Sequence, residues 1–95
     1  MEFEWDPDKA DANLRKHGIS FEFAKDAFLD DNSIEWADEY GHEERTVLLA
    51  LVEATILYII YTERTPVIRL ISARKADKHE QSTYYYENFS GRTPH

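Results

Sequence analysis

The stretch that decides the fold runs from Thr62 to Lys75 and reads T-E-R-T-P-V-I-R-L-I-S-A-R-K. Its apolar run over Val67 to Ile71 predicts a buried strand, and three arginines lie in or beside that run, namely Arg64, Arg69 and Arg74. A guanidinium does not give up its proton, so burying it costs free energy unless an anionic partner is near. The stretch therefore predicts a place where the protein meets an anion.

Side chains alternate between the two faces of a strand, and this alternation separates two of the arginines. Arg69 shares a face with Val67 and Ile71, whereas Arg74 falls on the opposite face. The two guanidiniums meet at one site only if the strand contains a bulge or ends before Arg74. We therefore take Arg64 and Arg74 as the safer pair for a common site.

Length and composition bound the class of protein. Ninety-five residues, of which 42% are apolar and 14% aromatic, suit one domain with one core and argue against disorder. The absence of cysteine excludes a disulfide scaffold and a zinc-thiolate site. The longest apolar run, Val47 to Val52, is too short for a membrane span, and the first residues lack the pattern of a signal peptide. We therefore expect a soluble cytoplasmic protein with one domain over residues 1–89 and a frayed tail over residues 90–95.

The net charge of −8 is divided unevenly along the chain. Residues 1–44 contain 14 Asp and Glu against 4 Lys and Arg, a balance of −10, whereas residues 45–95 contain 5 against 7, a balance of +2. The second half should therefore supply any surface that binds an anion. The acidic first half is either a solvated surface or one that meets a basic protein partner.

The first half predicts a short strand followed by two helices. The strand covers Phe3–Trp5, and Asp6 before a proline then caps a helix over about Pro7–His17. Gly18 should end this helix in the left-handed conformation. A second helix, over about Phe21–Leu29, has the stronger apolar face and is the better core element.

The inner face of the first helix is partly polar. Asn13 lies beside a stripe formed by Ala10, Leu14 and His17. Asn13 and His17 therefore need hydrogen-bond partners, of which nearby backbone groups are the simplest.

The second half predicts strands and a final helix. Four segments have the composition of strands and should form an antiparallel meander: Ser33–Tyr40, Arg45–Val52, Ile56–Thr62 and the opening stretch from Val67. Residues 41–44 turn the chain. After Arg74 the spacing of Ala76, Glu80 and Tyr84 becomes helical. We therefore predict an α+β fold, with a twisted antiparallel sheet packed on two N-terminal helices and a C-terminal helix near one edge.

The residues that could carry chemistry are basic groups and possible proton-transfer groups. The glycines are isolated, which excludes a phosphate loop, and the four histidines have no ligand spacing with one another. What remains is a set that includes Arg45, Arg64, Arg69, Arg74, His17, Glu44, Glu80 and Tyr84. Arginine binds phosphate through two parallel hydrogen bonds, and preorganised donors stabilise developing charge without a metal. Structural pairing of these arginines with the many carboxylates explains them equally well.

A set of motifs spans nearly the whole chain, from about residue 2 to residue 87. The motifs are Phe3–Asp6, Lys9, Asn13, Lys16–Ile19, Phe21, Ala24, Phe28, Glu44–Arg45, Tyr61–Arg64, Arg69–Arg74, Ala76, Glu80 and Tyr84. The segments K-H-G and I-S-A-R, in that order, are the most specific of them. Together they resemble the BrnT family of type II toxins.

This resemblance implies a RelE-like fold and a ribonuclease that stops translation, with no metal and no cofactor. The ribose 2′-hydroxyl would attack the adjacent phosphate and leave a cyclic phosphate. The implied catalytic residues are Arg64, Arg69, Arg74, His17, Glu80 and Tyr84, and the implied RNA-binding residues are Lys16, Arg45 and Lys75. The arginines would hold the phosphate, and the histidine, the glutamate or the tyrosine would move the protons. A helix C-terminus would favour a positive charge on the histidine.

The resemblance also implies a partner. This would be a BrnA-like antitoxin with a ribbon-helix-helix DNA-binding part, and the complex of the two would repress its own operon. Operator DNA would be contacted only through the antitoxin, and no membrane is involved. An alternative function is a non-catalytic, toxin-like binding module that holds its antitoxin and acts in operon autorepression. A third is an α+β domain with buried ion pairs and no catalysis.

Overall fold

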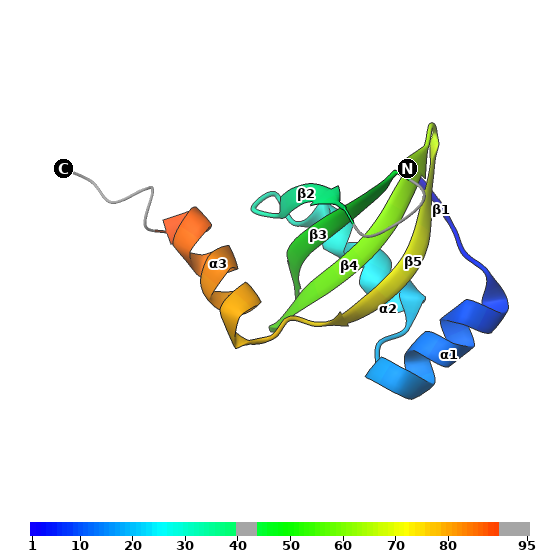
Figure 1. Cartoon of the computed structure of the whole chain (residues 1–95), viewed down its shortest axis with the longest axis horizontal. Coiled ribbons are helices and arrows are strands. Elements are labelled where there is room, and N and C mark those ends of the chain that lie inside the picture. Colours follow the sequence, from blue (N-terminus) through cyan, green and yellow to red (C-terminus); the bar gives the residue numbers. More distant parts are fainter. Residues whose placement is uncertain (40–43, 90–95) are drawn as a thin grey trace.

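The computed structural model describes residues 1–39 and 44–89 of the chain (Figure 1). In chain order its elements are β1 (Glu2–Glu4), α1 (Pro7–His17), α2 (Phe21–Ala24), the 3-10 helix η1 (Lys25–Leu29), β2 (Ile34–Asp38), β3 (Arg45–Val52), β4 (Thr55–Arg64), β5 (Val67–Lys75) and α3 (Lys78–Phe89). The α+β class is confirmed. The predicted frayed tail, and residues 40–43 of the predicted outer strand and turn, lie outside the described residues.

The second predicted helix is shorter than expected. α2 ends at Ala24, and the chain continues as η1, where the backbone N–H of Asp30 binds the carbonyl of Ala27 at 3.2 Å. The prediction of one α-helix over Phe21–Leu29 was therefore wrong in its second half. Apolar spacing does not distinguish these tighter turns, which are frequent at helix ends, from a regular α-helix.

All five strands form one sheet in the order β1-β5-β4-β3-β2. The strands β2 to β5 form the predicted antiparallel meander, but β1 pairs with β5 in parallel, with Glu4 opposite Arg69. The prediction of a purely antiparallel sheet was thus wrong at this edge. The cause is topological, because α1, α2 and three strands separate the two partners, and no local pattern encodes the direction of so distant a pairing.

A bulge in β5 changes which of its residues share a face. Ser72 and Leu70 pair with consecutive residues of β4, so that Ile71 has no β4 partner of its own. An extra residue shifts the alternation by one position. Arg69 and Arg74 therefore lie on the same face of the sheet. A bulge was one of the two conditions under which these two arginines could meet at one site; the other was a strand that ends before Arg74.

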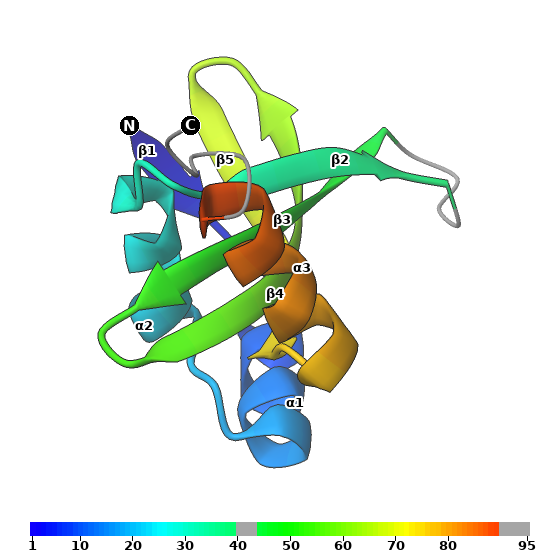
Figure 2. The ribbon, with the colours of Figure 1, turned by 90° about the vertical axis from the view of Figure 1, so that its left-hand side faces the viewer.

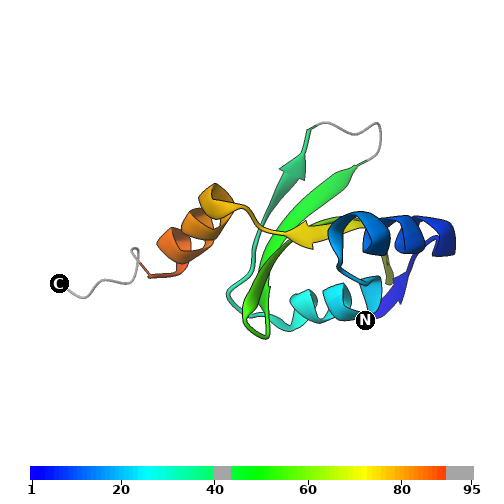
Figure 3. The ribbon, with the colours of Figure 1, turned by 90° about the horizontal axis from the view of Figure 1, so that it is seen from below.

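One face of the sheet, here called the helix-covered face, holds the main core. Phe21 and Ala24 of α2 are 1% and 0% exposed and pack against β3, β4 and β5 through residues such as Leu57 and Ile59. α1 buries a single residue, Asn13. The prediction that the second helix is the better core element is therefore confirmed. Figure 3 shows α2 lying along the sheet, with α1 and α3 at opposite ends of it.

The other face, here called the open face, meets α3 at one end (Figure 2). Tyr84 of α3 packs there with Leu49, Ile56 and Ala76, in a small cluster separate from the main core. The strand registers place four arginines further along this face, namely Arg45, Arg64, Arg69 and Arg74.

α1 is capped as predicted and is fastened to the sheet by its buried amide. The carboxylate of Asp6 accepts from the N–H groups of residues 8 and 9, and Gly18 ends the helix at a φ of 72°. The Asn13 side chain donates to the carbonyl of Ala73 at 2.8 Å and accepts from its N–H at 3.1 Å. It also donates to the carbonyl of Ile19 at 2.9 Å. The expected backbone partners of Asn13 are thus present, and one of them is on a distant strand.

Candidate functional site

A row of polar and charged side chains crosses the open face from edge to edge. The strand registers pair Glu4 of β1 with Arg69 of β5, Arg69 with Thr62 of β4, and Arg45 of β3 with Asp38 of β2. The register of β3 with β4 brings Arg45 beside Thr62. Residues paired across neighbouring strands point to the same face. These five side chains, which we call the cross-sheet row, therefore share one surface.

Arg69 makes a loose contact near the β1 edge of this row. Its Nη1 lies 3.6 Å from Oε1 of Glu4, and the two side chains remain 33% and 44% exposed. The two charges attract each other at this distance, but the contact is longer than a hydrogen bond. The guanidinium of Arg69 is therefore accessible to a ligand and has no hydrogen bond to Glu4 to give up.

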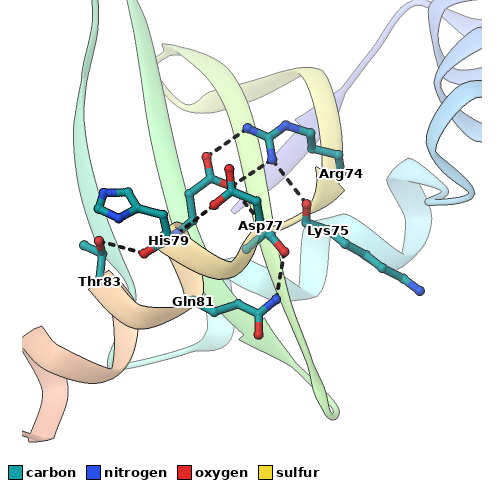
Figure 4. A network of polar contacts seen from close by, with 8 residues as sticks. Arg74, Lys75, Asp77, His79, Gln81 and Thr83 are labelled. Atoms are coloured by element: carbon teal, nitrogen blue, oxygen red, sulfur yellow. Dashed lines mark hydrogen bonds and ion pairs between the residues drawn. The ribbon is translucent and has the colours of Figure 1, made fainter.

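Arg74 is held much more tightly, where β5 meets α3 (Figure 4). Its two terminal nitrogens donate to the two carboxylate oxygens of Glu80 at 2.8 and 2.9 Å, and one of them also donates to the carbonyl of Lys75 at 3.2 Å. Its guanidinium carbon lies 4.0 Å from the centre of the Tyr58 ring. The hydrogen bonds to Glu80 raise the pKa of Arg74. Arg74 is therefore positioned before any ligand arrives.

Glu80 also caps the helix that it belongs to. Its Oε1 accepts from the backbone N–H of Asp77 at 2.9 Å, while its own N–H donates to Oδ1 of Asp77 at 2.8 Å. This reciprocal pair is a capping box. Glu80 is 16% exposed in its side chain and has both oxygens engaged. It therefore joins the first turn of α3 to β5.

Two further arginines complete the basic surface. Arg64 is exposed at the end of β4, in register with Val67. Arg45 is half-buried in the cross-sheet row, and its Nε has no hydrogen-bond partner in the described part of the chain. The same holds for the hydroxyl of the neighbouring Thr62, which is 5% exposed. The middle of the row thus carries unused hydrogen-bonding capacity.

Tyr84 is engaged on the inner side of α3. It is 3% exposed, and its hydroxyl donates to Oδ2 of Asp30 at 2.6 Å. Burial and this hydrogen bond raise the pKa of Tyr84. Burial also acts to raise the pKa of Asp30, but hydrogen bonds from Leu51 N–H, Tyr84 and Asn32 N–H outweigh it and lower that pKa. Tyr84 and Asp30 therefore fasten α3 to the sheet.

A groove runs between α1 and the edge of β5, here called the α1 groove. Its lining includes Lys9, Asn13, Lys16, His17, Ile71 and Ser72. His17 is half-buried at the last turn of α1, and Lys16 is exposed beside it. Both residues therefore lie close to the bulge of β5.

The structure brings part of the expected site together. Arg45, Arg64, Arg69, Arg74 and Glu80 share the open face or its border. The remaining expected residues lie elsewhere. His17 and Lys16 lie in the α1 groove, across the edge of β5, and Lys75 is exposed at the end of that strand. The hydroxyl of Tyr84 is hydrogen-bonded to Asp30.

Sequence reasoning missed Glu4, Asp38 and Thr62 as members of the cross-sheet row. Glu4 carries a usable signal, because it is a charged residue inside a short strand of large apolar ones. Thr62 carries none, since a threonine in a strand is ordinary.

Two negative findings apply to the residues that the structure describes. Within residues 1–39 and 44–89, no group of three or more His, Cys, Asp or Glu side chains gathers in a way that could hold a metal ion. In the same two segments, no helix has both the length and the apolar character needed to cross a membrane.

Comparison with known proteins identifies the family. Residues 5–80 match the family model described as "Ribonuclease toxin, BrnT, of type II toxin-antitoxin system", which covers well over half of the 95 residues. A search of curated proteins found no match. The match begins just after β1 and includes α1, the strands β2 to β5 and the Arg74–Glu80 pair. This chain therefore belongs to the BrnT family of ribonuclease toxins of type II toxin–antitoxin systems.

Proposed function

We propose that this toxin cleaves RNA on its open face by attack of a ribose 2′-oxygen, without a metal ion. The 2′-oxygen forms a bond to the adjacent phosphorus as its proton passes to a base, and the bond from phosphorus to the 5′-oxygen breaks. The leaving 5′-oxygen takes up a proton. The products are a 2′,3′-cyclic phosphate and a 5′-hydroxyl. The observation that carries this proposal is the gathering of four arginines on one face, with Arg69 only loosely paired.

Arg69 is the proposed main ligand of the scissile phosphate. Its ion pair with Glu4 is 3.6 Å long, so a phosphate can replace Glu4 at the guanidinium at little cost. Arg74, held by Glu80 on the same face, and the exposed Arg64 add positive charge. Donors fixed before the reaction stabilise the charge that develops on the phosphate without further reorganisation.

Glu4 is the proposed base. It lies next to Arg69 and is 44% exposed, whereas both oxygens of Glu80 are engaged by Arg74 and one also by the helix cap. A phosphate bound by Arg69 would place an adjoining 2′-hydroxyl near this carboxylate. A carboxylate within hydrogen-bond reach of the hydroxyl can accept its proton in the transition state.

His17 is the proposed donor to the leaving oxygen. It lies in the α1 groove with Ser72, and Ser72 falls between Arg69 and Arg74 on β5. An imidazole is suited to proton transfer near neutral pH. Tyr84 is left out of this catalytic group, because its hydroxyl is buried and already bound to Asp30. Glu80 is a positioning residue that acts through Arg74.

The fold, activity and partner that the resemblance to the BrnT family implies are part of the same proposal. We propose that the arrangement of sheet and helices is RelE-like and that the toxin stops translation. Its partner would be a BrnA-like ribbon-helix-helix antitoxin, through which alone it would contact operator DNA. Membership of a type II toxin family supports an antitoxin partner and an RNA target.

The test is RNA cleavage by the purified toxin with a chelator present. We expect single-stranded RNA to be cut, with 2′,3′-cyclic phosphate and 5′-hydroxyl ends. Arg69→Ala should slow the cleavage about 10² to 10³-fold, the usual cost of one lost charge-stabilising donor. Cleavage that requires added Mg²⁺, or that survives unchanged in Arg69→Ala, would contradict the proposal.

One observation favours a second function. Arg69 and Arg74 each have a carboxylate partner in the protein alone, so neither requires RNA as a counter-ion. A toxin-like module that only binds its antitoxin and tunes repression would show this pairing too. A chain that binds its antitoxin and represses the operon, yet cleaves no RNA at any concentration, would establish this alternative.

A further inference from the structure

We propose that the α1 groove holds the RNA phosphate that follows the scissile one, so that the strand crosses the edge of β5 from the open face onto α1. This inference rests on the proposed function and adds a second phosphate site to it. The groove has a volume of about 240 Å³, and the charged residues in its lining are Lys9 and Lys16, with His17 beside them.

The charge of the groove contrasts with the rest of the first half. Residues 1–44 contain only four Lys and Arg, which are Lys9, Arg15, Lys16 and Lys25. Two of these four line the α1 groove, whereas Lys25 is paired with Glu22 at 2.9 Å. An anion approaching the acidic half would therefore be drawn to this place. Affinity for RNA comes largely from such neutralisation of phosphates by lysine and arginine.

The groove is built on a fixed wall. Asn13 lies between the two lysines at helical spacing and exchanges two hydrogen bonds with the backbone of Ala73, at 2.8 and 3.1 Å. These bonds are buried and tie the middle of α1 to β5. Lys9, Asn13 and Lys16 fall at i, i+4 and i+7, which places them on one face of the helix. Both ammonium groups can therefore reach one anion beside the strand.

The open face and the α1 groove are joined through Ser72. The β4 register places Ser72 on the open face between Arg69 and Arg74, and Ser72 also lines the α1 groove. β1 covers the edge of β5 only as far as Arg69. Beyond that point the edge meets α1, and the bulge at Ile71 lies in the groove wall. A strand bound at Arg69 can thus continue over Ser72 without leaving a basic surface.

The test compares charge reversal inside and outside the groove. Lys9→Glu with Lys16→Glu is measured against Arg15→Glu, which makes the same kind of charge change on the same helix but does not line the groove. The probe is a single-stranded RNA with every 2′-hydroxyl methylated, which the parent toxin can bind but not cleave. Dissociation constants are measured across a salt series, and thermal melts confirm that each variant is folded.

Because the double variant reverses two charges and Arg15→Glu only one, two reversals outside the groove would weaken binding by the square of the Arg15→Glu factor. We expect the double variant to weaken binding at least about 10-fold beyond that square. The neutral variants Lys9→Gln and Lys16→Gln should each reduce the slope of log affinity against log salt by about 0.7, the value for one lost contact to single-stranded RNA. On cleavable RNA the double variant should raise KM more than it lowers kcat.

Two outcomes would overturn the inference. One is a double variant that binds RNA as Arg15→Glu does, in a set where the parent cleaves RNA and Arg69→Ala does not. This result would refute the second phosphate site in the α1 groove but would leave the proposed function intact. The other is a double variant that loses its antitoxin but keeps its RNA, which would make the groove a protein contact. A parent that neither binds nor cleaves RNA would remove the proposed function itself.

Discussion

An arginine–glutamate pair lies towards each end of β5, but the two pairs differ in how closely their side chains are held. Arg69 and Glu4 lie 3.6 Å apart at one end, and both side chains are a third or more exposed. Arg74 and Glu80 at the other end form two hydrogen bonds of 2.8 and 2.9 Å, with Tyr58 against the guanidinium. We call these the loose pair and the tight pair. Both lie on one face because of the bulge between them.

This difference suits the two pairs to different roles, one in binding phosphate and the other in holding α3 on the sheet. A loose pair can exchange its carboxylate for a phosphate, because it has few contacts to lose. A tight pair that also caps a helix cannot release its carboxylate without loosening the helix. The loose pair is therefore the expected site of chemistry, and the tight pair the frame that holds α3 and the neighbouring charge in place.

The largest expected effect falls on proton transfer near the loose pair. Glu4→Gln and His17→Ala should each lower the cleavage rate by about 10² to 10⁴-fold, the usual contribution of a general base or acid. An RNA with sulfur in place of the 5′-oxygen distinguishes the two roles, because a thiolate leaves without a proton. This substrate should restore cleavage by His17→Ala and not by Glu4→Gln. Restoration of both variants, or of neither, would show that these roles are assigned wrongly.

The next effect is on stability and belongs to the tight pair. Arg74→Ala removes two charged hydrogen bonds and strands Glu80, which should lower the free energy of unfolding by about 1.5 to 3 kcal/mol. Arg69→Ala, at the loose pair, should change it by less than about 0.5 kcal/mol. Urea unfolding of the two variants beside the parent measures both values. An equal loss of unfolding free energy for the two variants would show that the loose and tight pairs contribute equally to stability.

A third effect concerns the other attachment of α3. Because the pKa of Asp30 is lowered below its ordinary 3.8, its contribution to stability is present above that pH and is lost as the pH falls through the folded value. Asp30→Asn should cost about 1 to 3 kcal/mol at pH 7, with the difference from the parent shrinking in acid. Thermal melts between pH 7 and pH 2 follow it. A constant difference would mean that Asp30 does not titrate in this way.

The smallest expected effects lie at the caps of α1, away from both pairs. Asp6→Ala removes an N-cap and should cost about 1 kcal/mol. Gly18→Val should cost about 1 to 2 kcal/mol from left-handed backbone strain, since an added Cβ has no heavy atom within 4 Å outside the adjoining residues. Melting temperatures equal to the parent's for both variants would show that this helix is bounded elsewhere.

The sequence predicts the elements of this fold better than it predicts their partners. Asp6, Gly18 and the hairpin strands act through neighbours a few residues away, so their roles can be recognised locally. The parallel pairing of β1 with β5 and the bulge at Ile71 depend on contacts across the whole chain. No spacing in the sequence reveals either feature.

The candidate site shows the same limit. Three of its arginines stand out because charge interrupts an apolar run, but alternation alone separates Arg69 from Arg74. Only the bulge returns them to one face. Glu4 belongs to the site because β1 pairs in parallel with β5. Tyr84 does not belong to it, because its hydroxyl is bound by Asp30, which lies 54 positions away in the chain.

Binding of RNA to the open face is tested most directly by a map of where RNA contacts the folded toxin. Backbone amide shifts in NMR, recorded as 2′-methylated single-stranded RNA is added, report these contacts residue by residue. We expect the largest shifts on the open face and its border, at Glu4, Arg64, Arg69 and Ser72, with smaller shifts around Arg74. Shifts concentrated on α2 and η1, on the helix-covered face, would contradict it.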